Sequence, residues 1–185
     1  MDLRPISESW RSIERWVHER ERTDSLAAPA TPQEIETVQE RIAVQLPPEI
    51  VELLKRHNGS TFPFPPFYLL LGTQEIILKF ETKRSAWGES TFAPWSRHWV
   101  PFASDGSAGA LYVDTAPGSD GRVHEHTREG DSTLSSHPMW TSITALMHHT
   151  AEALDRVEQI DGYRPYQGDD DLIDWEDVTD DGEEL

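Results

Sequence analysis

Three short segments in the centre of the chain constrain the fold more than any other feature. They are residues 99–103 (Trp-Val-Pro-Phe-Ala), 110–114 (Ala-Leu-Tyr-Val-Asp) and 122–126 (Arg-Val-His-Glu-His), each of the length of one strand. Asp105-Gly106 and Gly109 separate the first two segments, and residues 117–121 (Pro-Gly-Ser-Asp-Gly) separate the last two. Because Asp, Gly and Pro favour tight turns, we predict an antiparallel meander. Pro101 restricts the first strand to an edge or an end of the sheet.

Helical patterns lie on both sides of this meander. Before it, apolar residues recur at steps of three and four over residues 6–17, and Thr31-Pro32-Gln33-Glu34 is typical of a capped helix start. Leu46-Pro47-Pro48 ends that helix and begins another, which we predict to end in a left-handed cap at His57-Asn58-Gly59. After the meander, the spacing over residues 140–157 predicts a long last helix. The order of elements indicates a single domain of the α+β class.

Two segments allow alternatives. Residues 67–71 are apolar and fit either a buried strand or a packed connection. Thr73 is a candidate cap for a helix with Ile76, Phe80 and Trp87 at helical spacing, whereas β-branched residues make a strand over residues 75–80 the competing prediction.

The C-terminal end differs in composition from the rest of the chain. Residues 168–185 contain ten Asp and Glu and no Lys or Arg. We therefore divide the chain into a domain over residues 1–160 and an acidic tail over residues 161–185. Leu172, Trp175 and Val178 recur every third residue, which suggests a short helix. The tail is then disordered, docked on its own domain, or docked on a partner.

The net charge of −18 limits the classes of partner. Such a chain is repelled by nucleic acid and by anionic lipid, and attracts a cationic protein. The alternative explanation is an adaptation for solubility, as in a salt-adapted organism. The absence of cysteine excludes disulfides, zinc–thiolate sites and thiol catalysis. No signal peptide and no apolar run of about 18 residues is visible, so the cytoplasm is the expected location and no membrane partner is expected.

The ordered set of motifs resembles the SUKH superfamily, in the branch named for the yeast cell wall assembly regulator. The resemblance covers roughly residues 7–158, and its residues are Trp10, Ile13 and Trp16, Thr31–Ile35, Leu46–Glu49, His57–Gly59, Trp99–Phe102, Asp105-Gly106, Leu111–Asp114, Pro117-Gly118 and Gly121–Val123. Each motif is weak alone, and the order makes the set specific. The acidic tail departs from the pattern.

The resemblance implies a curved antiparallel sheet flanked by helices. Members are generally regarded as protein-binding modules without a known enzymatic activity or cofactor. Many bacterial members look like immunity proteins that neutralise toxins, often nucleases, whereas the yeast branch is tied to cell-wall synthesis and signalling. The resemblance therefore implies a non-enzymatic binding protein, either of the immunity type or a regulator of an endogenous partner.

Candidate binding residues lie along the predicted meander. We expect Asp105, Asp114 and Glu125 to supply negative charge toward a cationic partner, and Trp95 or Trp99 to supply an aromatic anchor. For the two Asp the alternative is ordinary turn chemistry, and for the two Trp it is the core.

Two histidines are the candidates for a metal site. His124 and His126 share one face of their strand, which suits two metal ligands, with His98, Asp114 or His137 as a possible third. An exposed polar strand face is the simpler explanation of the pair, so we predict no metal. No nucleophile elbow, phosphate-binding glycine loop or zinc-protease helix occurs, and we predict no catalytic residue, with a small-ligand protein or enzyme as the third hypothesis.

Overall fold

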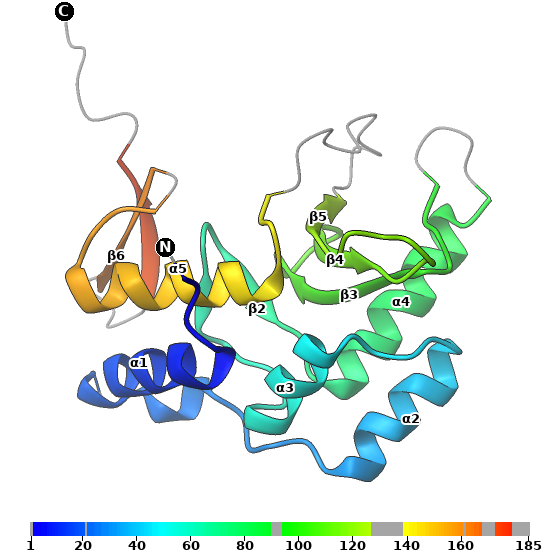
Figure 1. Cartoon of the computed structure of the whole chain (residues 1–185), viewed down its shortest axis with the longest axis horizontal. Helices are drawn as coiled ribbons and strands as arrows, with labels where there is room; N and C mark the ends of the chain where they lie inside the picture. Colours follow the sequence, from blue (N-terminus) through cyan, green and yellow to red (C-terminus); the bar gives the residue numbers. More distant parts are fainter. Residues whose placement is uncertain are drawn as a thin grey trace, which may run out of the picture.

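The computed structural model describes residues 2–20, 22–89, 94–126, 139–160, 162–167 and 173–178. Its helices are α1 (Ile6–Glu19), the 3-10 turn η1 (Thr23–Ser25), α2 (Pro32–Ile42), α3 (Pro48–Arg56), α4 (Thr73–Trp87) and α5 (Ile143–Arg156). Its strands are β1 (Pro63–Phe64), β2 (Tyr68–Leu70), β3 (Trp99–Ser104), β4 (Ala110–Asp114), β5 (Val123–His126), β6 (Tyr163–Gln167) and β7 (Ile173–Asp177). Helices flank a curled antiparallel sheet (Figure 1), which confirms the α+β class and the curved sheet.

The five-stranded sheet has the order β1-β2-β3-β4-β5, with every pair antiparallel. The predicted meander is thus confirmed as β3, β4 and β5. The prediction for Pro101 was wrong, because β3 is the central strand. Pro101 is tolerated there because β2 pairs only with Ala103 and Ser104, and the register shifts between Pro101 and Ala103. The missing N–H therefore falls where no neighbouring strand needs it.

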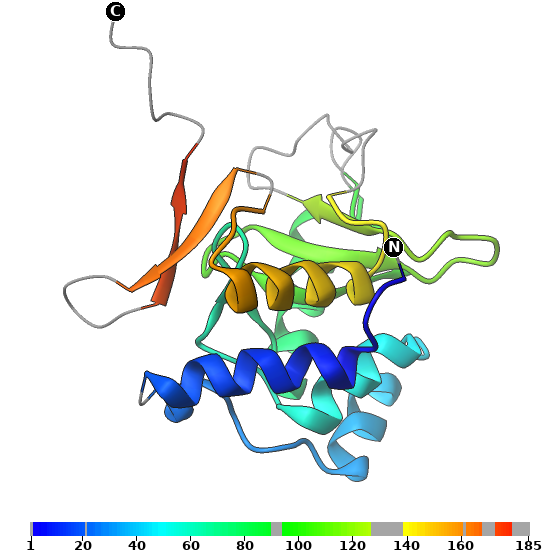
Figure 2. The ribbon, with the colours of Figure 1, turned by 60° about the vertical axis from the view of Figure 1, so that its left-hand side comes forward.

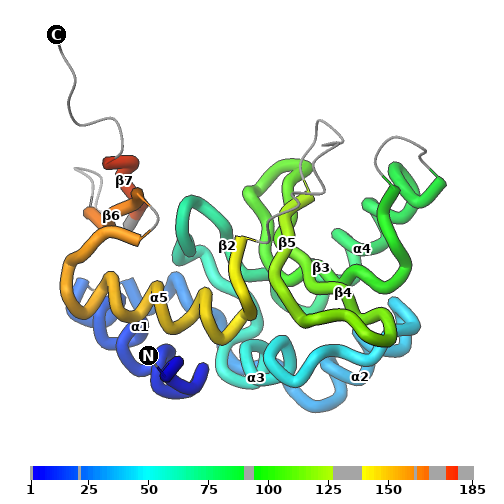
Figure 3. Tube along the Cα trace, turned by 45° about the horizontal axis from the view of Figure 1, so that its top comes forward, coloured from blue at the N-terminus to red at the C-terminus, as the bar shows by residue number. Residues whose placement is uncertain are grey.

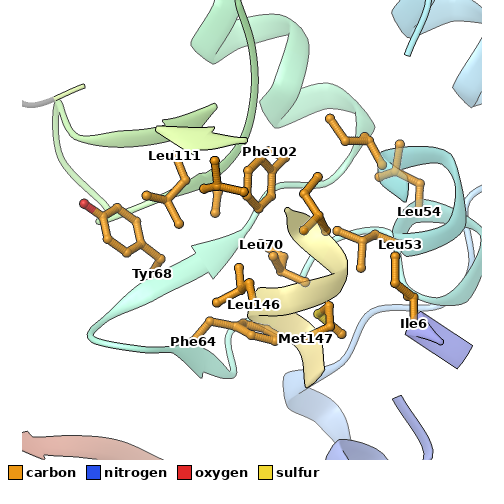
Figure 4. Close-up of a cluster of buried hydrophobic side chains, with 14 of the residues drawn as sticks. Ile6, Leu53, Leu54, Phe64, Tyr68, Leu70, Phe102, Leu111, Leu146 and Met147 are labelled. Atoms are coloured by element: carbon orange, nitrogen blue, oxygen red, sulfur yellow. The ribbon is translucent and has the colours of Figure 1, made fainter. Parts of the chain in front are cut away.

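The buried core lies between the sheet and α5, α3 and α1. In Figure 4, Leu146 and Met147 of α5 face Phe64 and Leu70 of the first two strands. All four side chains are at most 5% exposed. The Tyr68 hydroxyl points away from this cluster, toward the rim of the sheet.

Helix α1 runs beside α5 (Figures 1 and 2) and is bound to it by ion pairs. Asp155 accepts hydrogen bonds from Arg4 at 2.7 Å and from Arg15 at 2.6 Å. The apolar face predicted for residues 6–17 is buried, including Trp10 and Ile13 at 0% exposure. The amphipathic pattern alone therefore located this helix correctly.

The start of α2 confirms the predicted capping box. The Thr31 hydroxyl accepts from the Glu34 N–H at 3.2 Å, and Glu34 Oε2 accepts from the Thr31 N–H at 2.7 Å. We expect Thr31→Ala to lower the free energy of unfolding by about 1 kcal/mol in a urea titration, because the Glu34 N–H loses the hydroxyl that caps it and the Glu34 carboxylate loses the hydrogen bond from the same hydroxyl. Exposed Gln33→Ala is the control, and an equal loss in both variants would contradict the cap.

The structure decides or corrects four local predictions made from the sequence. Residues 75–80 are helical, which excludes the strand alternative, and α4 begins at Thr73 with Gly72 as its N-cap. Residues 68–70 form β2, whereas Phe67 is 51% exposed. Helix α3 ends in an extended His57, and the left-handed residue is Gly59, two positions later. Val157 is 62% exposed rather than part of the buried face of α5, because it forms the left-handed cap of that helix.

The C-terminal segment forms a hairpin rather than the predicted short helix. Strands β6 and β7 pair with each other and lie beside the end of α5, away from β3–β5 (Figure 3). Trp175 of β7 is 5% exposed, and its Nε1–H donates to the carbonyl oxygen of Pro63 in β1 at 2.8 Å. This part of the tail is therefore docked on its own domain. Leu172 lies outside the described residues, and the boundary at residue 160 stays a prediction.

None of the helices within the described ranges combines the length and the apolarity that are needed to cross a bilayer.

Candidate functional site

The five candidate residues fall at two ends of β4 instead of forming one cluster. Asp105 and Glu125 lie at the beginning of β4, next to Tyr68, whereas Asp114 ends β4 beside Trp99. At about 3.3 Å per residue, the two ends of this strand are roughly 13 Å apart. Any partner that uses both ends has to cover the length of the sheet.

The carboxylates at the first end are engaged within the molecule. Asp105 accepts hydrogen bonds from the Ser107 N–H at 2.8 Å and from the Ser107 hydroxyl at 2.9 Å. This is the turn chemistry that we kept as the alternative for Asp105. Glu125 accepts a short hydrogen bond from the Tyr68 hydroxyl. Burial, together with Glu125 and the nearby Asp105, raises the pKa of Tyr68 well above its usual value, so the phenol stays a donor.

The second end carries a half-buried tryptophan next to a carboxylate. Trp99 stands directly opposite Asp114 in the β3–β4 register and stacks on Tyr112, with 4.4 Å between the ring centroids. Tyr112 in turn stacks on His124 of β5 at 5.5 Å. We call Trp99, Asp114 and His124 the Trp99 patch; all three side chains are partly exposed. Asp114 Oδ1 also accepts from the Ala116 N–H at 2.8 Å, which orients the carboxylate.

Trp95 lies beneath this patch and is only 1% exposed. Its ring meets Trp99 at 5.6 Å and Tyr112 at 5.2 Å between centroids, both edge to face. Such contacts fix the position of the Trp99 ring. In this structure Trp95 therefore supports Trp99 from the interior and does not itself reach the surface.

A buried cation on the same side of the sheet was missed in the sequence. Lys83 of α4 is 3% exposed, and its Nζ lies 2.7 Å from His126 Nδ1 and 5.4 Å from the centroid of Trp95. Burial, reinforced by the neighbouring Lys79, lowers the pKa of Lys83 to about 8. The signal was available, because Phe80, Lys83 and Trp87 stand three and four residues apart on one helix face.

The histidine pair is divided between two environments. His124 is part of the stacked row, whereas His126 is 7% exposed and faces the Lys83 amine. Within the described ranges, no group of three or more His, Cys, Asp and Glu side chains is arranged to hold a metal. His137 lies outside those ranges. Four pockets of about 160 to 220 Å³ are lined by described residues, and none of the five candidate residues lines them.

Comparison with known proteins agrees with this α+β fold. The family model described as SMI1 / KNR4 family (SUKH-1) matches residues 29–148, which is more than half of the chain. The chain belongs to the SUKH-1 family. The resemblance noted in the sequence is thereby confirmed. The SUKH-1 match contains α2, all five strands of the main sheet and the Trp99 patch, while α1 and the β6–β7 hairpin lie outside it.

One curated relative of this SUKH-1 chain is the cell wall biosynthesis/cell cycle regulator smi1 of Schizosaccharomyces pombe. The two are 24% identical over 183 aligned residues, which cover 80% of this chain and 36% of the yeast protein. The chain thus spans about a third of the length of that relative. Membership of SUKH-1 supports a protein-interaction module in a family that is generally non-catalytic.

Proposed function

We propose that this SUKH-1 chain is a non-enzymatic module that acts in the cytoplasm and binds a cationic segment of another protein through the Trp99 patch. The observation that carries the proposal is a partly exposed indole held in place beside a carboxylate. An indole face attracts Lys and Arg side chains, and a neighbouring carboxylate adds a charged hydrogen bond. Trp95 contributes by holding Trp99 in position.

The charge of the whole chain supports the same class of partner. The net charge of −18 produces a negative field that speeds the approach of a cationic protein and weakens with added salt. Asp105 and Glu125 add to this field at the far end of β4, although their oxygens also accept bonds from Ser107 and Tyr68. Their expected role is long-range attraction rather than direct contact.

Two biological roles fit this chemistry. The first is an immunity-type protein that covers the active site of a cationic toxin domain such as a nuclease, since nucleases present basic surfaces to nucleic acid. The second is a scaffold or regulator of an endogenous partner. The second role is favoured by the similarity over 80% of this chain to the Schizosaccharomyces pombe regulator.

A pull-down at low salt, eluted with a salt step and identified by mass spectrometry, separates these roles. A single basic, toxin-like protein would support the immunity role, whereas an endogenous enzyme or cell-wall factor would support the regulator. An empty eluate would argue against both and direct attention to a small ligand. Affinity that does not change with salt would contradict the charge argument.

The patch is tested with the partner that the pull-down identifies. We expect Trp99→Ala to weaken binding by about 30-fold, as for an aromatic hot spot. Asp114→Asn keeps the acceptor for Ala116 and removes only the charge, so we expect a loss of about threefold to tenfold that shrinks at high salt. Exposed Asp2→Asn is the matched control, and melting curves verify that each variant is folded. Wild-type affinity in both patch variants would refute this site.

A further inference from the structure

An apolar groove runs along the outer side of α4. Leu71, Leu78, Thr82 and the stem of Lys79 line a pocket of about 220 Å³, together with Glu75 at one end. Leu78 is 65% exposed, the most exposed of the large apolar side chains in the described ranges. At about 100° per residue, Leu78 and Lys83 point roughly 140° apart around the helix, so this groove lies away from the Trp99 patch.

A second, polar pocket shares Glu75 with this groove. Its volume is about 160 Å³, and its walls include Asp24, Ser25 and Gly59 in addition to Glu75, which both pockets share. The Ser25 hydroxyl is buried and has no hydrogen-bond partner among the described residues. The side chain of Asp24 is 82% exposed. We call the two pockets together the α4 groove.

The charges at the polar end are negative and available. Glu75 Oε2 accepts from the Gly72 N–H at 2.5 Å, which leaves Oε1 for another donor. Arg22 forms a loose ion pair with Asp24 at 3.9 Å, too far for a hydrogen bond, so the Asp24 oxygens can still accept from another donor. Lys79 does not neutralise the groove, because its amine is turned to the carbonyl oxygen of Ser107 at 2.7 Å. Glu75 and Leu78 are one helical turn apart.

We infer that the α4 groove binds a short segment of a partner protein in which a large apolar side chain stands within one helical turn of a Lys or Arg. The apolar side chain covers Leu78 and Leu71, and the cation lies between Glu75 and Asp24, near the Ser25 hydroxyl. This is complementary in both polarity and charge. The chain's own C-terminal residues 179–185 carry four acids and no base, so the same charges repel them.

The groove is a second docking surface and does not depend on the Trp99 patch. The test uses a fluorescein-labelled, Ala-based helical peptide that carries one Lys and one Leu four residues apart. Two companion peptides have Leu replaced by Ser or Lys replaced by Glu. Binding to the full chain is measured by fluorescence anisotropy at low and at physiological salt, and its place by amide shifts in NMR spectra.

We expect the Lys–Leu peptide to bind and to shift amides of residues 75–82, and both companions to bind at least about tenfold more weakly. Leu78→Ser removes the exposed apolar side chain at no cost to the core and weakens binding by about tenfold. Glu75→Gln keeps an acceptor for Gly72 and weakens binding by about threefold, mainly at low salt. Leu3→Ser and Glu36→Gln, both exposed and elsewhere on the surface, leave binding unchanged.

Three results would overturn the inference. The first is equal binding by wild type and Leu78→Ser. The second is peptide binding that is lost in Trp99→Ala but retained in Leu78→Ser. This result would place the peptide on the Trp99 patch and would leave the proposed function intact. The third is a wild-type dimer in sedimentation that Leu78→Ser dissociates, which makes a second copy of this chain the occupant. Peptide binding that is lost in Leu78→Ser and retained in Trp99→Ala supports binding in the α4 groove.

Discussion

Replacing the buried Lys83 with methionine is expected to raise the free energy of unfolding by about 1–2 kcal/mol at pH 7. The amine is 3% exposed and forms no ion pair with any described residue, although it donates toward His126 Nδ1 and the His126 carbonyl oxygen. With a pKa of about 8 it is still mostly charged at pH 7, and burying that charge costs free energy. Methionine has a similar volume without the charge, and the lost bonds to His126 offset part of the gain.

The pH dependence of the same residue gives a sharper test. Between the folded pKa of about 8 and the usual value of 10.5, the unfolded chain keeps a proton that the folded chain has released. Stability therefore rises with pH, by about 2–3 kcal/mol from pH 8 to pH 10. Above pH 10 the trend reverses, because burial raises the pKa of Tyr68 and of Tyr112, which stay protonated only in the folded chain.

Urea titrations from pH 7 to pH 10 measure this effect. Wild type shows the full rise, and exposed Lys55→Met behaves as wild type. Lys83→Met loses most of the rise and keeps a smaller one, because burial also lowers the pKa of Lys79. A rise of equal size in Lys83→Met would show that Lys83 is not the titrating group.

The second large effect is expected from Trp175→Ala, which should release the β6–β7 hairpin. Two strands alone are marginally stable in water, so this hairpin depends on its contact with β1. Trp175 supplies a buried indole and a hydrogen bond to Pro63. Removing a buried Trp costs about 3–5 kcal/mol, enough to accelerate local amide exchange by at least about 100-fold.

Hydrogen exchange separates this local opening from global unfolding. We expect the amides of residues 163–164, 166–167 and 173–177 to lose protection in Trp175→Ala, while β3 and β4 keep theirs. Trp175→Phe retains most of the buried area without the hydrogen bond. Its hairpin protection should fall between that of the wild type and that of Trp175→Ala. Tyr166→Ala, at a 41% exposed aromatic on the opposite face of the same hairpin, is the control. Undiminished hairpin protection in Trp175→Ala would mean that the contact with Pro63 does not hold it.

Release of the hairpin has a consequence for β1. This two-residue strand is the edge of the main sheet, and β7 lies against it. An uncovered edge offers unpaired N–H and C=O groups to other chains. We therefore expect the Trp175→Ala protein to aggregate earlier on heating, even where its core is unchanged.

Local patterns in the sequence were enough to locate several helices and strands of this protein. Periodicity located α1, turn residues located the meander of β3, β4 and β5, and the box at Thr31 located the start of α2. Each of these signals acts between residues a few positions apart, so no other part of the chain is needed to interpret it. The ordered set of motifs was also sufficient for the family, because it follows the order of elements along the chain.

Which side chains meet depends on contacts between segments that are distant in sequence. Asp105 and Asp114 carry the same charge in similar turns, yet β4 separates them and only Asp114 lies beside Trp99. Trp95 is buried because Tyr112 and His126, distant in sequence, close over it. The described part of the tail forms a hairpin because Trp175 is buried against β1 and donates a hydrogen bond to the Pro63 carbonyl oxygen. This contact outweighs the helical spacing of the local sequence. Burial against residues distant in sequence contributes several kcal/mol, whereas local propensity contributes tenths of a kcal/mol per residue. Burial therefore determines the structure of such segments.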